Sequence, residues 1–428
     1  MRVRDSGHGH GHGRGGGSGR GGGHGGGRPG RRRSGRALAI GGAVAAATAL
    51  LTGLTPASAT AARTAAPAAH TTLDADVRAV RAAGGDVRVL AEVDTGRGVL
   101  RSRAGGSAAP TPWDARFRAA STTKTFTSVV VLQLAAEKKL SLDDTVEKWL
   151  PGVVKGHGND GARITVRDLL RQTSGLFDYV DDPELGRALA ESFEKHRYDT
   201  TPATEWVAVA LRHRPLFLPD PAHPRWAYSN TNYLLAGMIA EKAGGLPWRE
   251  QVEHRIIAPL GLRGTSVPGA NPYLPGPHAR VTLRTPDGGR TDVTDHSIQH
   301  TADSGVVSTT ADLRAFFRAL AGGKLLPPAQ LREMQRTVAR TGDADDLAEW
   351  PAGGYGLGLR WTPLTCGGGY WHHEGDGFGS YTRTGVTPDG RRSVAVSVTS
   401  DGDRPDLVRL NQATRKLADD ALCGRAGR

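Results

Sequence analysis

The sequence is poor in cysteine, lysine and aromatic residues. It holds two Cys and 6% aromatic residues in 428 positions, and its 55 basic residues comprise nine lysines and 46 arginines. The length suffices for a large core with more than one subdomain. Because lysine is scarce, each lysine in a polar motif is informative. Two cysteines alone do not favour a zinc site.

The chain also has little excess of positive over negative charge outside its N-terminal segment. The formal net charge is +12, but residues 1–36 hold nine Arg and one Asp and so account for +8 of it. Residues 37–59 carry no charge, which leaves +4 for the rest of the chain. This mild surplus is spread along the sequence. It does not indicate nucleic acid binding.

Long apolar runs are lacking, with one exception near the N-terminus. Residues 6–30 form a Gly/His/Arg tract of low complexity, which we expect to be disordered. The basic segment 31–36 precedes the uncharged apolar stretch Ala37–Leu54 and the small residues at 57–59. This order is typical of a signal peptide cleaved after Ala59. An uncleaved anchor is the alternative, because the stretch is barely long enough to span a bilayer. We expect a secreted protein without a stable membrane anchor.

Export of the protein would place its two cysteines in an oxidising environment. Cys366 and Cys423 both lie near the C-terminus. An oxidising compartment favours one disulfide between them, and two unpaired buried thiols are the alternative.

Strand patterns occur at both ends of the chain, with helical patterns between them. We therefore expect an α/β fold of the α+β type: an antiparallel sheet built from N- and C-terminal segments, flanked by helices, with a mostly helical inserted domain. The predicted strands are 87–93, 98–103, 116–120, 356–362, 370–374, 381–387 and 393–399. The predicted helices are 73–83, 126–134, 166–171, 204–212, 233–243, 248–257, 311–320 and 405–422.

These patterns also divide the chain into domains. A tail and signal peptide (1–59) and a linker (60–72) precede one large domain (73–422), and a short tail (423–428) follows. Within the domain we predict a sheet subdomain at about 73–120 and 350–422 and a helical subdomain at about 121–345.

A hydroxyl and an amine stand three residues apart in Ser121 and Lys124, at the head of the apolar run Phe126–Leu134. On a helix, positions i and i+3 share a face, so the two side chains can meet. A serine hydroxyl becomes a good nucleophile when a base takes its proton, and a lysine serves as that base when its pKa is lowered. The pair indicates covalent acyl transfer. A second Ser-x-x-Lys at 192–195 sits in a charged stretch and is interpreted as a coincidence.

Two further motifs support the first pair. Tyr228 and Asn230 form a Tyr-x-Asn that occurs once in the sequence, and an apolar segment follows it. Farther along, His373 precedes Glu374 and Gly375 on a predicted strand, and Asp376 opens a glycine-rich loop. A hydroxyl–amine pair, then Tyr-x-Asn, then a basic residue two before a glycine form an ordered signature.

With these motifs the chain resembles the penicillin-recognising serine hydrolases, in the branch of class C β-lactamases, secreted D-alanyl-D-alanine carboxypeptidases and related esterases. The resemblance spans about residues 75–422. It is supported by the segments 167–176, 259–262, 305–309 and 354–358. It implies a hydrolase without metal or cofactor.

The resemblance also implies a role for each motif residue. Ser121 would be acylated, and Lys124 and Tyr228 would share the role of general base. A Tyr228 phenolate needs nearby positive charge, which Lys124 and His373 would supply. Asn230 would hold the lysine amine and the substrate amide. Backbone N–H groups of Ser121 and Asp376 would form the oxyanion hole.

The acidic residues after His373 depart from the family pattern. Carboxypeptidases of this branch usually have a hydroxyl residue where Glu374 stands, and it helps to seat a terminal carboxylate. We expect Glu374, Gly375 and Asp376 to line the substrate site. Two carboxylates there would oppose an anionic substrate unless they point away or an arginine compensates. A metal site at His372, His373 and Glu374 is disfavoured because the spacing of a zinc motif is incomplete.

The first expectation by resemblance is a D-alanyl-D-alanine carboxypeptidase acting on cell-wall peptides. An esterase or D-amino-acid amidase on the same scaffold is the alternative, followed by a β-lactamase. A protein that only binds peptidoglycan stem peptides is the non-enzymatic alternative. We expect a monomer whose partners are small peptide, ester or amide substrates. A Gly-x-Ser-x-Gly elbow is absent from the sequence, which disfavours an α/β-hydrolase.

Overall fold

The computed structural model describes residues 71–427, apart from 107–109, 186–192, 286–287, 341–346 and 349. The low-complexity tract, the predicted signal peptide with Ala59 and nearly all of the predicted linker lie outside the described residues. Ser192 of the second Ser-x-x-Lys lies outside them as well, whereas Lys195 is exposed.

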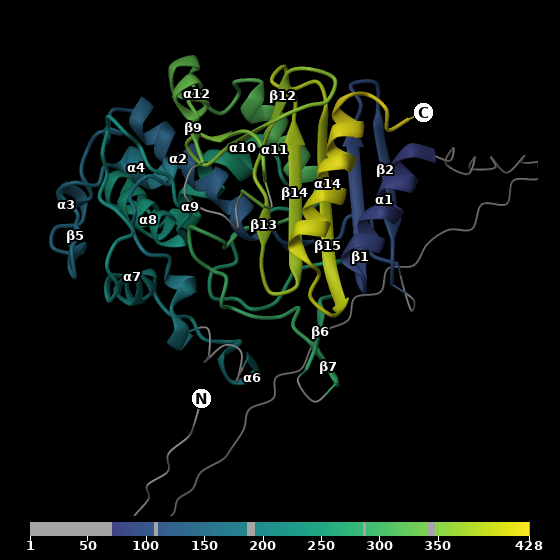
Figure 1. Ribbon diagram of the computed structural model, residues 1–428, viewed down its shortest axis with the longest axis horizontal. Coiled ribbons are helices and arrows are strands. Elements are labelled where there is room, and N and C mark those ends of the chain that lie inside the picture. Colours follow the sequence, from purple (N-terminus) through teal and green to yellow (C-terminus); the bar gives the residue numbers. More distant parts are fainter. Residues whose placement is uncertain are drawn as a thin grey trace, which may run out of the picture. The chain divides into compact units, whose positions relative to one another are not determined.

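The central sheet joins strands from both ends of the chain (Figure 1). Eleven described strands belong to it, in the main order β2-β1-β15-β14-β12-β11-β10-β9, and β13 pairs with β14. Its pairs are antiparallel except where β6 lies parallel to β15. The strands are β1 (Val87–Asp94), β2 (Val99–Ala104), β6 (Thr282–Arg284), β7 (Arg290–Asp292), β9 (Val338–Ala339), β10 (Gly354–Tyr355), β11 (Arg360–Pro363), β12 (Gly369–His372), β13 (Gly375–Asp376), β14 (Ser380–Val386) and β15 (Ser393–Gly402).

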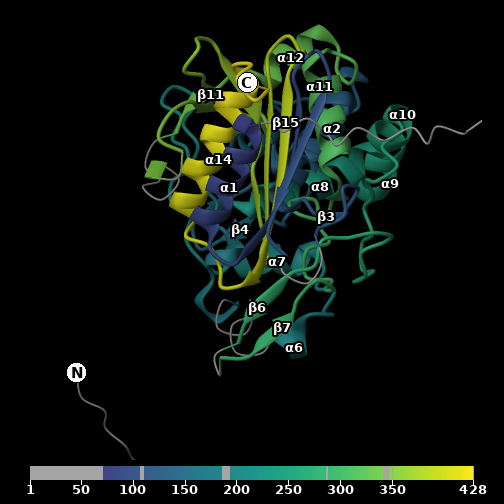
Figure 2. The same cartoon turned by 90° about the vertical axis from the view of Figure 1, so that its right-hand side faces the viewer.

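Both faces of the sheet are covered by helices, as the edge-on view shows (Figure 2). Alternate residues of β1 point to opposite faces. Val89 and Val93 join one apolar cluster with α1 (Thr71–Gly84) and α14 (Leu407–Leu422). Leu90 joins the larger cluster on the other face. Each face of the sheet therefore has its own core.

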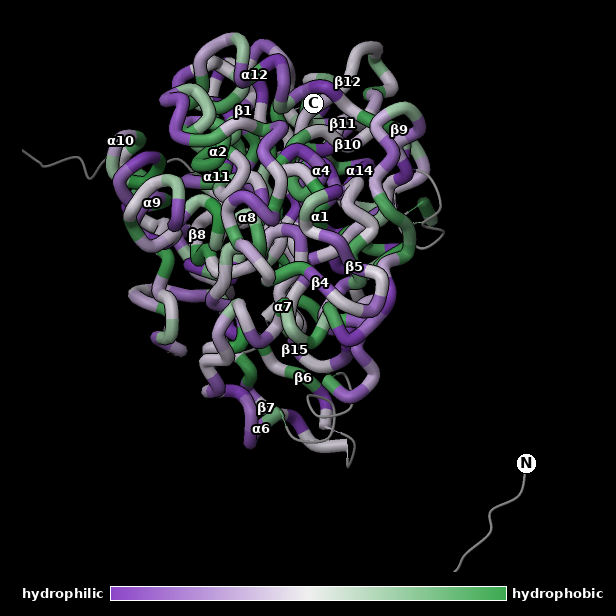
Figure 3. The backbone as a smooth tube through the Cα atoms, turned by 90° about the vertical axis from the view of Figure 1, so that its left-hand side faces the viewer, coloured by the Kyte–Doolittle hydropathy of each residue, from purple (hydrophilic) through white to green (hydrophobic). Residues whose placement is uncertain are grey.

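The larger core lies under helices contributed by the middle of the chain, where apolar stretches of α2, α8 and α11 gather (Figure 3). The main helices here are α2 (Thr123–Ala136), α4 (Val166–Arg171), α7 (Ala203–Leu211), α8 (Asn230–Gly244), α9 (Trp248–Val252), α11 (Thr310–Ala321) and α12 (Pro328–Met334). Shorter elements are β3 (Phe117–Arg118), η1 (Ala120–Thr122), α3 (Val146–Trp149), β4 (Lys155–Gly156), β5 (Asn159–Asp160), η2 (Tyr179–Asp181), α6 (Phe193–His196), η3 (Glu253–Ile257), α10 (Ala258–Leu260) and β8 (Val307–Ser308).

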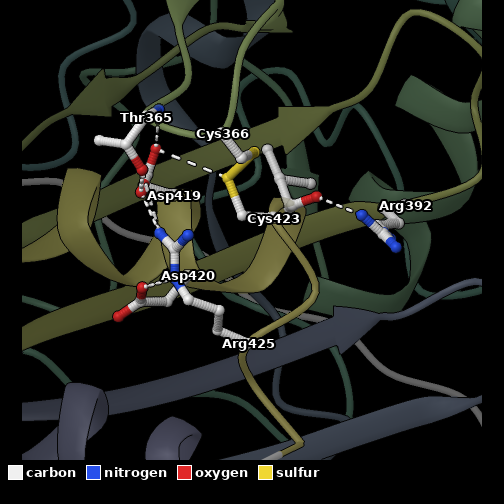
Figure 4. The surroundings of a disulfide bond; sticks show 8 residues. Thr365, Cys366, Arg392, Asp419, Asp420, Cys423 and Arg425 are labelled. Atoms are coloured by element: carbon white, nitrogen blue, oxygen red, sulfur yellow. Dashed lines mark hydrogen bonds and ion pairs between the residues drawn. A yellow bond between two sulfur atoms is a disulfide. The ribbon is translucent and has the colours of Figure 1, made fainter.

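A disulfide joins Cys366, in the loop between β11 and β12, to Cys423 at the end of α14 (Figure 4). The two Cα atoms are 5.9 Å apart and the cysteines are 57 residues apart in sequence. Beside it, Asp419 accepts hydrogen bonds from the backbone N–H of Thr365 at 2.7 Å and from the guanidinium of Arg425. The predicted pairing of the two cysteines is thus present in the structure.

The predicted α/β fold is confirmed, but the bounds of several elements differ; the predicted strand 116–120, for example, is reduced to β3, because Ala120 begins the turn η1. Of the predicted strand 356–362, only the part from Arg360 onward is a strand (β11), because the residues between β10 and β11 form a turn at Gly358 with a φ of +69°. The predicted strand 370–374 ends at His372, because the backbone N–H and C=O of His373 bond the side-chain hydroxyl of Thr384 instead of the backbone of β14. The predicted helix 248–257 closes with a π-helical turn, η3.

The residues after α14, which we predicted to be a short tail (423–428), pack against the domain at Ala426. Ala426 is 1% exposed, and its carbonyl accepts a hydrogen bond from the backbone N–H of Leu73 at 3.3 Å. Across the described part of the chain, none of the helices has the length and apolar character needed to cross a membrane.

Candidate active site

Ser121 lies on the short turn η1, immediately before helix α2. The preceding residue, Ala120, has a φ of +47°, a left-handed conformation that is unfavourable for a residue with a Cβ. The turn is fastened by a hydrogen bond of 3.3 Å from the Thr122 hydroxyl to the His373 carbonyl. The local backbone is thus held in a tight bend that places Ser121 at the wall of a cavity.

Lys124 lies one helical turn after Ser121 and is fully buried. Its Nζ donates to Ser121 Oγ at 2.9 Å, to Asn230 Oδ1 at 2.6 Å and to the Asp303 carbonyl at 3.1 Å. Burial lowers the pKa of Lys124 to about 8, even though the carboxylates of Asp303 and Asp178 favour the charged form. A lysine with this pKa is partly neutral near pH 7 and can accept the proton of the serine hydroxyl.

Asn230 begins helix α8 and links Lys124 to a buried carboxyl group. Its Oδ1 accepts from Lys124, and its Nδ2 donates to Asp178 Oδ2 at 2.8 Å. Burial raises the pKa of Asp178 to about 7, against the hydrogen bond from Asn230. The sequence predicted contact with both the lysine and the substrate. In the structure the Asn230 Nδ2 is bonded to Asp178.

Asp303 approaches Lys124 from the loop before β8. Its carbonyl accepts from Lys124, while its side-chain oxygens accept from the hydroxyls of Tyr179 at 3.0 Å and Thr301 at 2.5 Å. Both hydroxyl donors are neutral, and the Asp303 carboxylate favours the charged form of Lys124.

Tyr228 lies over the lysine, with Nζ of Lys124 5.0 Å from its ring centroid. Burial and the charge of Glu374 raise the pKa of Tyr228 well above its usual range, whereas a hydrogen bond with Ser121 and the Arg360 cation lower it. The resting side chain is therefore the phenol, placed to exchange a proton with Ser121.

His373 does not provide positive charge in this structure. Its Nδ1 lies 2.6 Å from the Glu374 carbonyl and must donate to it, so Nε2 accepts from the Tyr355 hydroxyl at 3.0 Å. Burial lowers the pKa of His373 to about 4. The expectation that this histidine is a cation beside Tyr228 is corrected: it is a neutral, fully buried ring.

Glu374 does not line the cavity as expected, because its side chain is buried in an ion pair. Oε1 lies 2.6 Å from Arg360 Nε, and Oε2 lies 3.7 Å from His372 Nδ1. Burial opposes its charge, but the Arg360 guanidinium holds the pKa of Glu374 below its usual range.

Asp376 does line the cavity, and an arginine compensates its charge as well. Its Oδ1 lies 2.7 Å from Arg383 Nη1. Gly375 lies against the turn that carries the nucleophile: a Cβ at this position would be 2.0 Å from the Ala119 carbonyl oxygen and 3.1 Å from the Ser121 nitrogen. A side chain at position 375 would displace the serine, so glycine is required.

The cavity in front of Ser121 has a volume of about 770 Å³. Its polar end is formed by Ser121, Asn230, Asp303 and Asp376. Most of its remaining wall is apolar or aromatic, from Tyr179, Val180, Trp206, Ile298, Phe378 and Leu407. Two arginines, Arg284 and Arg404, are also among the residues that line it. In the described ranges, no group of three His, Cys, Asp or Glu side chains is arranged to hold a metal ion.

Sequence reasoning missed four residues of this site: Asp178, Asp303, Tyr355 and Arg360. The first two reach Lys124 from loops that carry no local pattern. Arg360 had a signal, since two acidic residues at 374 and 376 in an otherwise apolar strand region require cations nearby. Arg360 and Arg383, in strand patterns of their own, are those cations.

The chain matches a family model described as Beta-lactamase over residues 56–419. Among solved structures it is similar to a D-stereospecific amidohydrolase from a Streptomyces species. The two share 41% identity over 80% of this chain and 98% of that one, with a TM-score of 0.72.

Two further relatives are more distant. A D-amino acid amidase from Ochrobactrum anthropi SV3 is 24% identical over 82% of this chain and 97% of its own, with a TM-score of 0.67, and shows the same fold. Penicillin-binding protein 4* from Bacillus subtilis is 30% identical over 37% of this chain. The match spans about a third of that relative's length (32%).

Proposed function

Because this chain belongs to the beta-lactamase family of penicillin-recognising serine hydrolases, we propose that it is a D-stereospecific amidohydrolase. It would cleave amides and esters of D-amino acids or short peptides through an acyl-enzyme on Ser121. The resemblance seen in the sequence put a D-alanyl-D-alanine carboxypeptidase first and an esterase or D-amino-acid amidase second, and we propose the reverse order.

One observation carries the chemistry: the 2.9 Å hydrogen bond between Ser121 Oγ and the fully buried Lys124 amine, whose pKa is lowered to about 8. The neutral amine, with Tyr228, accepts the proton as Oγ bonds to the substrate carbonyl carbon. The same groups return the proton to the leaving amine or alcohol. Water then attacks the acyl carbon, and its proton follows the same route.

The charge of the cavity supports a substrate without an anionic group beside the reacting carbonyl. Asp303 lies at its polar end, and its carboxylate, whose hydrogen-bond donors are two neutral hydroxyls, would not favour a terminal carboxylate there, whereas the charge of Asp376 is compensated by Arg383. The aromatic and aliphatic wall fits an apolar side chain on the acyl part of the substrate. The 41% identity to the Streptomyces amidohydrolase supports the same substrate class.

A D-alanyl-D-alanine carboxypeptidase is the second candidate, and the arginines are the observation in its favour. Arg404 and Arg284, the latter paired with Asp403 at 2.7 Å, line the cavity and could bind the carboxylate of a longer peptide. Peptidoglycan stem peptides would be substrates of this kind.

Export of the protein to an extracellular space is part of the proposal. The N-terminal sequence pattern and the Cys366–Cys423 disulfide both support it, since disulfides persist in oxidising compartments. A monomer that acts on small substrates without a cofactor is also part of the proposal, and the cavity at Ser121, of about 770 Å³, supports small substrates.

A substrate panel on residues 60–428 tests the proposed function. It would compare D-phenylalanine amide and methyl ester, their L-enantiomers, a D-Ala-D-Ala peptide and a chromogenic cephalosporin, with Ser121→Ala as the control. We expect the D-amide and D-ester to be hydrolysed fastest, with no turnover by Ser121→Ala. Preference for the D-Ala-D-Ala peptide would favour the second candidate, and turnover by Ser121→Ala would contradict both.

A further inference from the structure

A buried arginine lies behind Tyr228. Arg360 is 3% exposed, and its Nε is 2.6 Å from Glu374 Oε1. Its guanidinium carbon lies 5.2 Å from the ring centroid of Tyr355, 5.6 Å from that of Trp226 and 5.9 Å from that of Tyr228. A guanidinium within about 6 Å of an aromatic ring is attracted to it. The cation is therefore held both by three rings and by a carboxylate.

Such a cation is needed at this point of the site. Proton transfer from Ser121 requires Lys124 or Tyr228 to be deprotonated, and a fully buried environment disfavours the phenolate. His373 is neutral, because its Nδ1 donates to a carbonyl and its Nε2 accepts from Tyr355. An arginine stays charged at every pH at which the enzyme works. Arg360 thus holds the charge that the histidine lacks.

Charged and titratable groups face Tyr228 from several elements. Arg360 on β11 is a cation, Glu374 is an anion, and Lys124 on α2 and Asp178 are groups that titrate near neutral pH. Tyr179 and Tyr355 are neutral neighbours. Glu374 raises and Arg360 lowers the pKa values of both Lys124 and Tyr228. The Arg360–Glu374 ion pair therefore influences how readily the Lys124–Tyr228 pair accepts a proton.

On the basis of the proposed acyl-enzyme function, we propose that Arg360 is a positioning residue that acts through Tyr228 and Lys124. Its charge favours the state in which this pair has lost one proton and can accept that of Ser121. Glu374 holds the guanidinium beside the aromatic rings and, by its own charge, offsets part of the influence of Arg360 on the Lys124–Tyr228 pair. Arg360 makes no contact with substrate in this account.

Three variants test the proposal: Arg360→Met, Arg360→Lys and Glu374→Gln. The rate of Ser121 labelling by a fluorophosphonate and kcat/KM for D-phenylalanine p-nitroanilide are measured between about pH 5 and pH 10. Arg360→Met should shift the acidic limb of both profiles upward by about one pH unit, a loss of about tenfold below the limb. Arg360→Lys should restore its position. Glu374→Gln should shift the limb to lower pH, the opposite direction.

A purely structural role of Arg360 predicts a different result. Both rates would then fall at every pH in the Arg360 and Glu374 variants, and the acidic limb would stay in place. Arg360→Lys would not restore the rates. Arg314→Met is the matched control, because Arg314 is also buried and forms an ion pair of 3.1 Å with Glu92. This control should lose thermal stability without moving the limb.

The outcomes separate this inference from the proposed function. If the folded wild-type enzyme is not labelled at any pH, the acyl-enzyme function is refuted, and this inference with it. If it is labelled but the limb does not move, only the role of Arg360 is refuted. Should Arg360→Met fail to fold, Glu374→Gln decides, since it retains the cation and nearly the same volume. An unmoved limb or an alkaline shift in that variant overturns the proposal.

Discussion

Lys124 and Lys416 lie on helices on opposite sides of the same sheet, and their surroundings shift their pKa values in opposite directions. Lys124 has no exposed surface, and its amine bonds three neutral oxygens. Lys416 has a side chain 65% exposed and pairs with Asp420 at 2.5 Å and Asp76 at 3.1 Å. Burial lowers the pKa of Lys124, whereas the hydrogen bond to Asp420 raises that of Lys416.

The difference shows how one residue type serves two purposes. Near Ser121, the acidic groups reach the lysine through the side chain of Asn230 or act from a distance, so the amine can lose its proton. On the α14 face, direct carboxylate partners fix the charge, and the disulfide lies in the same region. The first face favours reactivity and the second favours stability.

The largest expected effect comes from removing the buried lysine. Lys124→Ala deprives Ser121 of its base, and we expect kcat/KM to fall about 10³- to 10⁴-fold. Lys416→Ala is the matched control and should stay within about twofold of wild type, because exposed pairs contribute little. Steady-state kinetics on a D-amino-acid amide provide the measurement. A Lys124→Ala enzyme within tenfold of wild type would contradict the comparison.

The disulfide should affect stability and leave the chemistry intact. Opening a loop of 57 residues by replacing Cys366 and Cys423 with Ala is expected to lower the free energy of unfolding by about 4 kcal/mol. Urea denaturation of the double variant checks this value, and kcat at 25 °C should remain near that of wild type. A large loss of kcat in fully folded protein would show that the two faces are not independent.

A smaller effect is expected from a methyl group beside the nucleophile. Gly375→Ala would place a Cβ 2.0 Å from the Ala119 carbonyl and displace the turn before Ser121. We expect kcat to fall about 10²-fold, as misplaced reacting groups typically cause. Gly98→Ala is the control: nothing lies within 4 Å of its Cβ position, and its activity should be unchanged. Equal activity of the two variants would contradict the close approach of Gly375 to the Ala119 carbonyl.

The smallest effect is a change of rate with pH. Since the neutral amine is the base and the pKa of Lys124 is about 8, kcat/KM should fall about tenfold per pH unit below that value. It should rise toward a plateau above it, until another group titrates. A profile that is flat from about pH 6 to pH 9 would mean that the lysine amine does not titrate in the active enzyme.

Sequence patterns predicted the fold and the reacting residues because both depend on local order. Alternating apolar residues marked the strands at both ends, and the spacing of Ser121 and Lys124 placed them on one helical turn. The Tyr-x-Asn motif begins α8, so Asn230 reaches Lys124. Motifs of this kind carry their geometry within a few residues.

The electrostatics of the site were not predictable in the same way. Whether His373 is charged depends on Tyr355, on another strand, and on the break after β12. Whether Glu374 faces substrate depends on Arg360, fourteen residues earlier on a strand paired with β12. Such partners meet through sheet pairing, which the sequence of one chain does not reveal.

The central claim is that Ser121 forms a covalent acyl-enzyme with Lys124 as its base, and mass spectrometry of the trapped protein tests it most directly. The folded enzyme is treated with a fluorophosphonate, and the labelled peptide is identified. We predict one adduct per chain, on Ser121, and labelling slowed by about 10³-fold or more in Lys124→Ala. An adduct on another residue, or labelling that is equally fast without Lys124, would contradict the account.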